Sequence, residues 1–312
     1  MTSNNPEFSI ILLTYNREKY LALQLPELIK LNNTEIIIVD NASSSDYSNN
    51  LSAQYKNTQC IKLDKNYGAV GRNFGIQAAT GKYLITLDDD VWGITNKGLN
   101  TIKEIFEENS LISAACFKVL DEKSGEITNW CHHCDPIKFS ENSFDTYEIS
   151  EGAVVFRREI FSEVGLYPFE FFISHEGPDL AFRIINSGKR IIYTPKIEVI
   201  HAHAIEGRKS WRRYYYDTRN LIWLAYRNYN WDMILTKLPI SLAAMLLYSI
   251  RDGFIRYYFK AIKDAIIGIK HLRGTRQPIT RATRKKMKVM DANRPSLIFY
   301  IKKRLFTKGV KI

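Results

Sequence analysis

A strand that ends in three acidic residues is the most informative stretch of this sequence, and residues 83–90 have the sequence YLITLDDD. The apolar part, Tyr83 to Leu87, has the length and composition of a strand in the centre of a sheet. Three adjacent carboxylates raise the cost of ionising one another unless a cation is bound nearby. Asp88 and Asp90 share one side of an extended chain, so this side is predicted to hold Mg²⁺ or Mn²⁺. The alternatives are a solvated acidic loop and a helix N-cap.

Two more apolar strands precede this one, and each also ends in polar residues. Residues 8–13 (FSIILL) and 35–39 (EIIIV) are followed by two polar clusters, Thr14, Tyr15, Asn16 and Arg17, and Asp40 and Asn41. Helical patterns separate the strands, which predicts βαβ units and a mostly parallel sheet of the α/β class. Ligands of such sheets bind at the carboxyl ends of the strands, where all of these polar residues fall.

Further residues fit a nucleotide-binding role at the same edge. Asp40 could accept hydrogen bonds from a base or a ribose, although the sequence DNAS also suits an Asx turn. Residues 66–75 (NYGAVGRNFG) combine flexible glycines with Arg72, which could pair with a diphosphate or with the carboxylates. An ordinary helix start with a surface arginine is the alternative for this segment. Its other candidate binding residues are Asn66, Gly68 and Asn73.

Charge is distributed unevenly along the 312 residues, which carry a net charge of +11. Residues 1–200 contain 19 Lys and Arg against 27 Asp and Glu, whereas residues 201–312 contain 25 against 6. The C-terminal third therefore needs an anionic partner such as lipid headgroups, a lipid-linked pyrophosphate or nucleic acid. We expect no nucleic acid, because no recognised nucleic-acid module accompanies the charge.

The basic C-terminal third has the pattern of helices that lie on a membrane surface. Its longest uncharged run, residues 238–250, is too short for a membrane span of about 20 residues. Apolar blocks edged by Lys and Arg over residues 233–290 instead predict amphipathic helices on anionic lipid. A helical subdomain packed on the rest of the chain, or a contact in a homodimer, is the alternative.

The N-terminus and the cysteines predict a cytoplasmic location. Residues 1–9 lack a basic flank followed by an apolar core, so we expect no secretory signal. Four cysteines are too few and too unevenly placed for a disulfide framework, and we expect free thiols. The sequence CHHC at residues 131–134 has zinc-ligand residue types but no second pair at zinc-finger spacing. We assign this loop to acceptor recognition.

The strand-end motifs, in this order and spacing, resemble the nucleotide-binding half of family 2 glycosyltransferases of the rhamnosyltransferase-like bacterial type. The resemblance covers roughly residues 8–203. It implies the GT-A fold, a Rossmann-like, mostly parallel central sheet flanked by helices, here followed by a C-terminal basic amphipathic helical extension. The implied catalytic domain covers residues 1–208, with a nucleotide-binding half (1–91) and an acceptor and catalytic half (92–208). Residues 209–312 would form the membrane-associating extension.

The same resemblance implies roles for individual residues. Nucleotide-sugar binding falls to Thr14, Tyr15, Asn16, Arg17, Asp40, Asn41, Asn66, Gly68, Arg72, Asn73, Asp88 and Asp89. Metal binding falls to Asp90, Asp88 and His201. The family motif that carries the catalytic base commonly reads Glu-Asp-x-Asp-Leu, whereas residues 176–180 are EGPDL. Glu176 is therefore the predicted base, and Asp179 is the alternative.

The implied enzyme transfers a sugar from a UDP-sugar or a dTDP-sugar to a hydroxyl of a glycan or lipid-linked acceptor. Transfer is expected to invert the sugar, to depend on Mn²⁺ or Mg²⁺, and to serve cell-surface polysaccharide or glycoconjugate synthesis at the inner face of the cell membrane. The chain lacks the Gln-x-x-Arg-Trp motif of processive synthases, which favours one sugar per encounter. A sugar-nucleotide pyrophosphorylase would need a glycine-rich loop where TYNR stands. The other alternative is an inactive transferase-fold adaptor that binds anionic lipid or nucleic acid.

Overall fold

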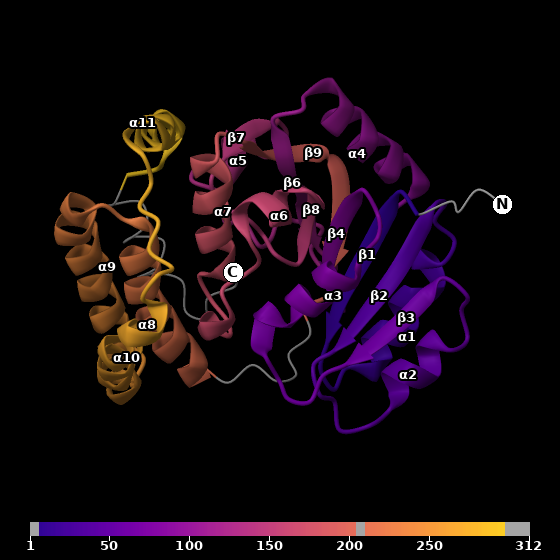
Figure 1. Ribbon diagram of the computed structural model, residues 1–312, viewed down its shortest axis with the longest axis horizontal. Helices are drawn as coiled ribbons and strands as arrows, with labels where there is room; N and C mark the ends of the chain where they lie inside the picture. Colours follow the sequence, from indigo (N-terminus) through magenta and orange to yellow (C-terminus); the bar gives the residue numbers. More distant parts are fainter. Residues whose placement is uncertain (1–5, 204–209, 297–312) are drawn as a thin grey trace.

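A single mixed sheet forms the centre of the computed structural model, which describes residues 6–203 and 210–296 (Figure 1). Its strand order is β3-β2-β1-β4-β8-β6-β9-β5, and β7 pairs with β9. The strands are β1 (Phe8–Thr14), β2 (Thr34–Asp40), β3 (Thr58–Lys62), β4 (Tyr83–Asp88), β5 (Val91–Trp92), β6 (Ile112–Asp121), β7 (Phe144–Thr146), β8 (Ala153–Arg157) and β9 (Arg190–His201).

Helices cover both faces of this sheet. They are α1 (Glu18–Leu28), α2 (Tyr47–Ser52), α3 (Arg72–Ala78), α4 (Asn96–Glu108), α5 (Pro136–Phe139), α6 (Ile160–Val164), α7 (Glu176–Asn186), α8 (Ser210–Asn228), α9 (Trp231–Arg251), α10 (Ile255–Gly268) and α11 (Arg281–Met290). Short 3₁₀ helices are η1 (Gly68–Gly71), η2 (Phe169–Phe171), η3 (Ile269–Leu272) and η4 (Asp291–Asn293).

The first half of the sheet is parallel, and this aligns its carboxyl ends. β1 pairs in parallel with both β2 and β4, and β2 pairs in parallel with β3. Thr14 lies opposite Asp40, and Leu13 lies opposite Asp88. The predicted α/β fold with its flanking helices is therefore confirmed, and the polar residues that follow these strands meet at one edge.

The second half of the sheet contains antiparallel pairs and one strand that is longer than predicted. β8 pairs antiparallel with β4 and with β6. The run at residues 190–193 (RIIY) predicts a strand that ends at Tyr193, but β9 continues to His201. Its pairing with β6 shifts between Thr194 and Glu198, which leaves Pro195 in a bulge where its missing N–H breaks no ladder hydrogen bond.

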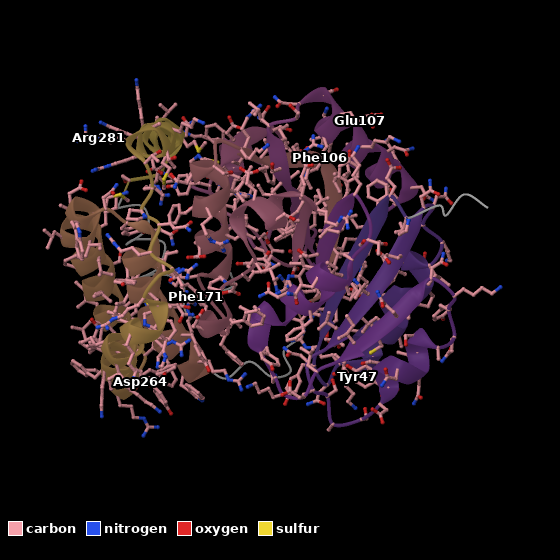
Figure 2. All side chains as sticks on the ribbon, viewed as in Figure 1. Tyr47, Phe106, Glu107, Phe171, Asp264 and Arg281 are labelled. Carbon is pink, nitrogen blue, oxygen red and sulfur yellow. The ribbon has the colours of Figure 1, made fainter. Side chains whose placement is uncertain are left out.

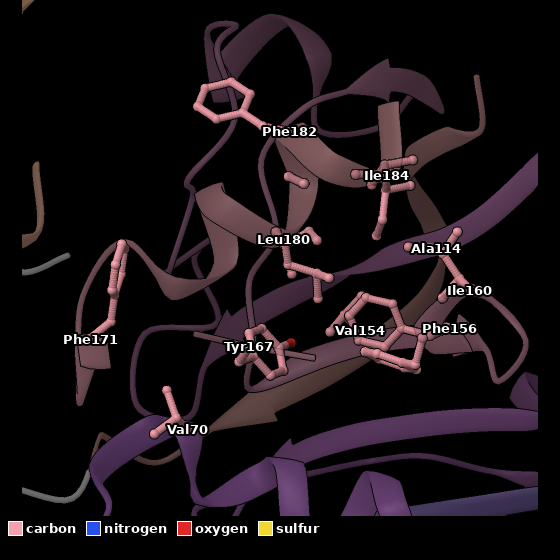
Figure 3. Packing of buried hydrophobic residues seen from close by; sticks show 14 of the residues in the cluster. Val70, Ala114, Val154, Phe156, Ile160, Tyr167, Phe171, Leu180, Phe182 and Ile184 are labelled. Atoms are coloured by element: carbon pink, nitrogen blue, oxygen red, sulfur yellow. The ribbon is translucent and has the colours of Figure 1, made fainter. Parts of the chain in front are cut away.

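Alternating strand residues fill two apolar layers. Ile10 and Leu12 of β1 face a cluster completed by α1 and α4, whereas Ile11 faces the cluster completed by α3, α6 and α7. Figure 3 shows Leu180 of α7 packed over β8 within the second cluster. This alternation is what a two-residue side-chain period produces in a sheet buried on both faces.

The C-terminal helices pack against this second layer. α8 contacts α7, and α8 to α10 lie beside α7 away from β1 to β3 (Figure 1). Trp223 of α8 and Ala265 of α10 belong to the same buried cluster as the sheet residues. Phe171 lies at the junction of the two parts, 6.0 Å from Trp223 between ring centroids (Figure 2). The predicted domain boundary at 208 and 209 lies outside the described residues.

Helix α9 is longer than the uncharged run that predicted it. It spans 21 residues from Trp231 to Arg251, and charged residues near its ends are part of the same helix. By length and composition alone it could cross a membrane, and 11% of its most apolar window is buried in the protein. A single helix of this kind is weak support for a membrane span.

Candidate active site

Two arginines balance the acidic end of β4. Arg17 Nη1 lies 2.9 Å from Asp89 Oδ1 and 3.4 Å from Asp90 Oδ2. Arg72, from the first turn of α3, pairs with Asp88. Burial raises the pKa of Asp89 to about 6, although the positive charge of Arg17 opposes this rise. The structure therefore brings these five predicted site residues together around one cluster of charge.

A candidate metal site adjoins this cluster. Asp88, Asp90 and His201 each offer a ligand atom, and these atoms lie within 4.8 Å of one another. His201 reaches the acids because β9 continues past its bulge and pairs with β5, and its Nε2 is 3.2 Å from Asp90 Oδ1. Two carboxylates and an imidazole suit Mn²⁺, and the carboxylates also suit Mg²⁺. The donor set fits the predicted cofactor.

Asn129 orients the imidazole of His201, and sequence reasoning missed it. Its side-chain nitrogen is 2.7 Å from His201 Nδ1. The ring of His203 lies beside that of His201 at an interplanar angle of 33°, with ring centroids 3.9 Å apart, and its Nε2 is 2.9 Å from Thr128 Oγ1. Partners of this kind hold a ligand histidine in one orientation. A lone asparagine in a loop has no local signal that would have identified it.

Residues after β2 and β3 form a second part of the site. Asp40 Oδ1 accepts a hydrogen bond of 2.7 Å from the Ser43 amide. Its Oδ2 is buried and has no hydrogen-bond partner among the described residues. Asn41 accepts from the Tyr67 amide at 2.7 Å and donates to the Gly68 carbonyl at 2.9 Å. Asp40 therefore keeps an acceptor for a ligand, while Asn41 shapes the loop beside it.

The loop that Asn41 shapes can only contain glycine at position 68. Asn66 Oδ1 accepts a hydrogen bond of 2.7 Å from the Gly68 amide. Gly68 has a φ of 66°, and a side chain there would overlap the main chain of Phe172. The missing side chain thus allows two distant segments to touch.

The loop after β1 is held by side chains rather than by secondary structure. Thr14 Oγ1 lies 2.8 Å from the hydroxyl of Tyr47. Asn16 has a φ of 54°, and its side-chain oxygen accepts from the Ser44 amide at 2.9 Å. Tyr15 is 44% exposed. Its ring therefore remains accessible to a ligand.

Asn73 lies in the core instead of at the edge of the site. It is fully buried, donates to the Tyr167 carbonyl at 2.8 Å and accepts from the Tyr167 amide at 3.1 Å. Its side chain thus satisfies main-chain groups that would otherwise be unpaired. In this structure it joins α3 to the loop that follows α6.

Glu176 is a buried acid at the start of α7. Its Oε2 has no hydrogen-bond partner among the described residues. Burial, and then the nearby negative charge of Glu151, raise the pKa of Glu176 well above its ordinary value. A carboxylate in such surroundings holds a proton more tightly than an exposed one does, which is the property required of a general base near neutral pH.

Gly177 leaves room for Glu151, a second acid that sequence reasoning did not assign to the site. A Cβ at position 177 would overlap the carboxylate of Glu151, which also accepts a hydrogen bond from the Gly177 amide. Gly152, which follows Glu151 in the chain, lies against the carboxylate of Asp88. The departure from the family motif at Gly177 thus coincides with a different carboxylate beside Glu176.

Asp179 is enclosed by basic and amide groups. Arg183 Nε donates to it at 2.9 Å, Arg227 Nε at 2.6 Å and Asn228 Nδ2 at 2.7 Å. Burial alone would raise the pKa of Asp179, but the charges of Arg183 and Arg227 bring it below its ordinary value. Both oxygens are engaged, and the group joins α7 to α8.

Three residues of the CHHC loop, His132, His133 and Cys134, are buried, whereas Cys131 is exposed. His132 Nδ1 lies 3.1 Å from Thr146 Oγ1, and His133 stacks on Tyr147 with ring centroids 5.4 Å apart. All four cysteines are free thiols. No zinc-type cluster of His and Cys occurs among the described residues. The assignment of this loop to acceptor recognition stays a prediction.

Comparison of the sequence with known proteins gives a family and several distant relatives. The model of the family described as Glycosyl transferase family 2 matches residues 9–165. The O-antigen chain rhamnosyltransferase WbaN of Salmonella anatum is 23% identical over 228 residues, which are 67% of this chain and 70% of WbaN. The dTDP-rhamnosyl transferase RfbF of Shigella flexneri is 24% identical over 301 residues, which are 86% of this chain and 98% of RfbF.

Solved structures show the same fold at low identity. TarS 1–349 from S. aureus, in complex with UDP-GlcNAc, is 18% identical with a TM-score of 0.55. The similarity covers 70% of this chain and 66% of TarS 1–349. The mannosyltransferase PcManGT from Pyrobaculum calidifontis, in complex with GDP-Man and Mn²⁺, is 16% identical with a TM-score of 0.55. This similarity covers 98% of this chain and 88% of the PcManGT chain. Both comparisons establish the GT-A fold alone.

The contacts of Asp179 and Glu176 predict that substitutions at these two acids change the stability of the protein in different ways. Asp179→Ala leaves two buried arginines without their counter-charge and is expected to lower the free energy of unfolding by about 3–5 kcal/mol. Glu176→Gln removes a buried acid whose Oε2 has no hydrogen-bond partner in the described ranges, and it is expected to be neutral or stabilising. Urea unfolding of both variants measures this difference. Equal stability of the two would contradict a structural role for Asp179.

Proposed function

The chain belongs to glycosyl transferase family 2, and from this premise we propose that it transfers a sugar from a UDP-sugar or dTDP-sugar to a hydroxyl acceptor. Transfer inverts the configuration of the sugar at its anomeric carbon, and one sugar is added per encounter. The observation that carries the proposal is the group of Asp88, Asp90 and His201 beside the nucleotide cradle, which comprises Asp40, Asn41 and the loop at residues 66–68. The name of RfbF supports dTDP-rhamnose as a donor, and the UDP-GlcNAc complex of TarS supports UDP.

Each half of the donor has a partner at this edge. Asp40 Oδ2, which has no hydrogen-bond partner among the described residues, would accept a hydrogen bond from an N–H of the base. Arg17 and Arg72 carry positive charge to the side where the diphosphate would lie. Asp88, Asp90 and His201 would hold a divalent ion. When bound, such an ion supplies positive charge that stabilises a departing diphosphate.

Glu176 is the proposed base. The acceptor oxygen forms a bond to the anomeric carbon of the donor sugar, and the bond from that carbon to the diphosphate breaks. Glu176 receives the hydroxyl proton, and the diphosphate leaves with the electron pair. Asp179 is a poor candidate because its oxygens already accept hydrogen bonds from Arg183, Arg227 and Asn228.

An inactive adaptor that retains the fold is the alternative. It would bind a nucleotide or an anionic surface through the same basic residues without turnover. Within the described residues, one buried oxygen of Glu176 has no hydrogen-bond partner, and this favours the enzyme, because an unpaired buried acid is costly to keep without a catalytic use.

A donor screen tests the proposed enzyme. With Mn²⁺ or Mg²⁺ present, release of UDP or dTDP from the matching sugar nucleotide is expected, and a chelator should abolish it. Asp90→Ala should lower the rate by about 100-fold or more, because it removes a ligand for the charge that stabilises the leaving group. Glu107→Ala, which removes an exposed acid on α4, is the control. Donor binding with no release under any condition would favour the adaptor.

The neighbouring acids predict how activity depends on pH. Burial and the charge of Glu151 raise the pKa of Glu176, so kcat/KM should rise with pH through that raised pKa. Glu151→Gln removes a negative neighbour, makes the anion of Glu176 easier to form, and should move the acidic limb of kcat/KM to lower pH. The exposed Glu170→Gln should leave the limb in place. An unmoved limb in Glu151→Gln would count against the coupling.

We also propose that α9 holds the protein on the inner face of the cell membrane as a peripheral, cytoplasmic enzyme. Leu235, Ile240 and Leu247 are 62–75% exposed on this helix. The surrounding region, residues 233–290, is rich in Lys and Arg. Exposed apolar side chains with basic neighbours favour binding to anionic lipid, where a glycan or lipid-linked acceptor would also be found. A second copy of the chain is the other partner that such a face could bind.

A triple substitution on α9 tests the membrane proposal. The L235S/I240S/L247S variant should lose most of its flotation with vesicles that contain phosphatidylglycerol. Apolar surface buried in the membrane contributes about 25 cal/mol per Å² to the free energy of binding, and the variant loses the surface of three side chains. The matched control, L23S/L111S/I137S, replaces three exposed apolar residues outside α9 and should float like the unmodified protein. Unchanged flotation of the α9 variant together with a smaller mass in solution would indicate a dimer contact instead.

A further inference from the structure

The segment that leads into Glu176 is strained. Phe172, Ser174 and His175 have φ values of 65°, 76° and 66°. The Ile173 amide donates to the Phe171 carbonyl at 2.8 Å, which closes a three-residue turn around Phe172. Turns of this hand are rare and strained, and side chains other than glycine seldom adopt positive φ. Such a backbone persists only when its surroundings hold it in place.

Asn220 of α8 supplies the hydrogen bonds that hold this segment. It is fully buried, and its Nδ2 lies 2.8 Å from the Phe171 carbonyl, 2.8 Å from the Ile173 carbonyl and 2.7 Å from the Ser174 carbonyl. Its side-chain oxygen accepts from Arg219 Nε at 2.9 Å, which orients the amide. One side chain from the C-terminal helices therefore satisfies the main chain on both sides of the turn.

The two ends of the segment are held by different groups. Near Phe171, Arg219 Nη2 donates to the Glu170 carbonyl at 3.0 Å and the Phe171 carbonyl at 2.9 Å. The Phe172 carbonyl accepts from the Ala69 amide at 2.7 Å, next to the nucleotide cradle. Near Glu176, the Ile173 and Ser174 carbonyls depend on Asn220, and the Ser174 hydroxyl donates to Asp217 at 2.6 Å.

We propose that Asn220 is a positioning residue for sugar transfer, because its amide holds the strained main chain that places the carboxylate of Glu176. This inference rests on the proposed function, in which Glu176 receives the acceptor proton. Under this proposal, α8 contributes a positioning residue to the active site in addition to connecting the sheet to α9 and α10. Asn220 touches no substrate, and its effect on the reaction passes through Glu176.

The separation of the two ends predicts which kinetic constant responds. Without the amide of Asn220, Arg219 still holds the Phe171 carbonyl and Ala69 still holds the Phe172 carbonyl. The side that faces the nucleotide cradle therefore keeps its contacts. The Ile173 and Ser174 carbonyls lose theirs, and the displacement falls on Glu176. A shift of about 1 Å in a reacting group can lower a rate by about 100-fold.

Steady-state kinetics of the full chain with Asn220→Ala test the proposal. We expect kcat to fall by about 10- to 100-fold while the KM for the donor changes by less than about twofold. The control is Thr218→Val on the same helix, where a buried hydroxyl without a hydrogen-bond partner among the described residues is replaced by a methyl group of similar size. This variant should keep kcat. Thermal melts of both variants correct each rate for the folded fraction.

Three results would overturn the inference. They are an unchanged kcat per folded molecule, a loss confined to the donor KM, and an equal loss of kcat in Thr218→Val. Glu176→Gln separates this failure from failure of the proposed function. If Glu176→Gln keeps full transfer, the assignment of the base is wrong. If it abolishes transfer while Asn220→Ala has no effect on kcat, the base stands and only the positioning role is lost.

Discussion

Mutual repulsion among the three carboxylates that end β4 is the constraint on which this edge of the protein depends. Asp88, Asp89 and Asp90 can stay ionised together only when positive groups approach them. Arg17 from the loop after β1 and Arg72 from the start of α3 supply this charge, and the imidazole of His201 reaches Asp90 from the end of β9. Because these groups are far apart in the sequence, only the folded sheet brings them to the acidic end of β4. The same demand for positive charge makes it a candidate site for a cation and a diphosphate.

A second set of buried polar contacts joins the C-terminal helices to this edge. Asp179 of α7 is neutralised by Arg227 of α8, and Asn220 of α8 holds the turn that precedes Glu176. Trp223 continues the apolar core between the same two parts. The basic third of the chain therefore has two faces with different chemistry. One completes the interior beside the proposed base, and the other exposes the apolar residues of α9.

Local patterns predicted much of the fold and part of the site, for physical reasons. Apolar runs of strand length and the polar residues at their ends identified β1, β2 and β4, because burial and parallel pairing dictate that pattern. β9 was predicted to end too early, since Pro195 is normally incompatible with a strand and only a bulge accommodates it. Glu151, Asn129 and Asn220 could not be found, because each is an isolated residue whose role depends on a partner from another element.

By itself, the sequence determined that acids, arginines and glycines would gather where parallel strands end, because side-chain period and strand direction are local properties. It also determined the contrast between an acidic first part and a basic C-terminal third. The motif at residues 176–180 ranked Glu176 ahead of Asp179 as the base, but only the tertiary structure supplied the physical difference between these two acids of one helix. Arg183 and Arg227 enclose Asp179, whereas Glu176, beside Glu151, has an oxygen that nothing in the described part of the chain hydrogen-bonds. The surroundings of a buried acid set its proton affinity, and packing alone supplies those surroundings.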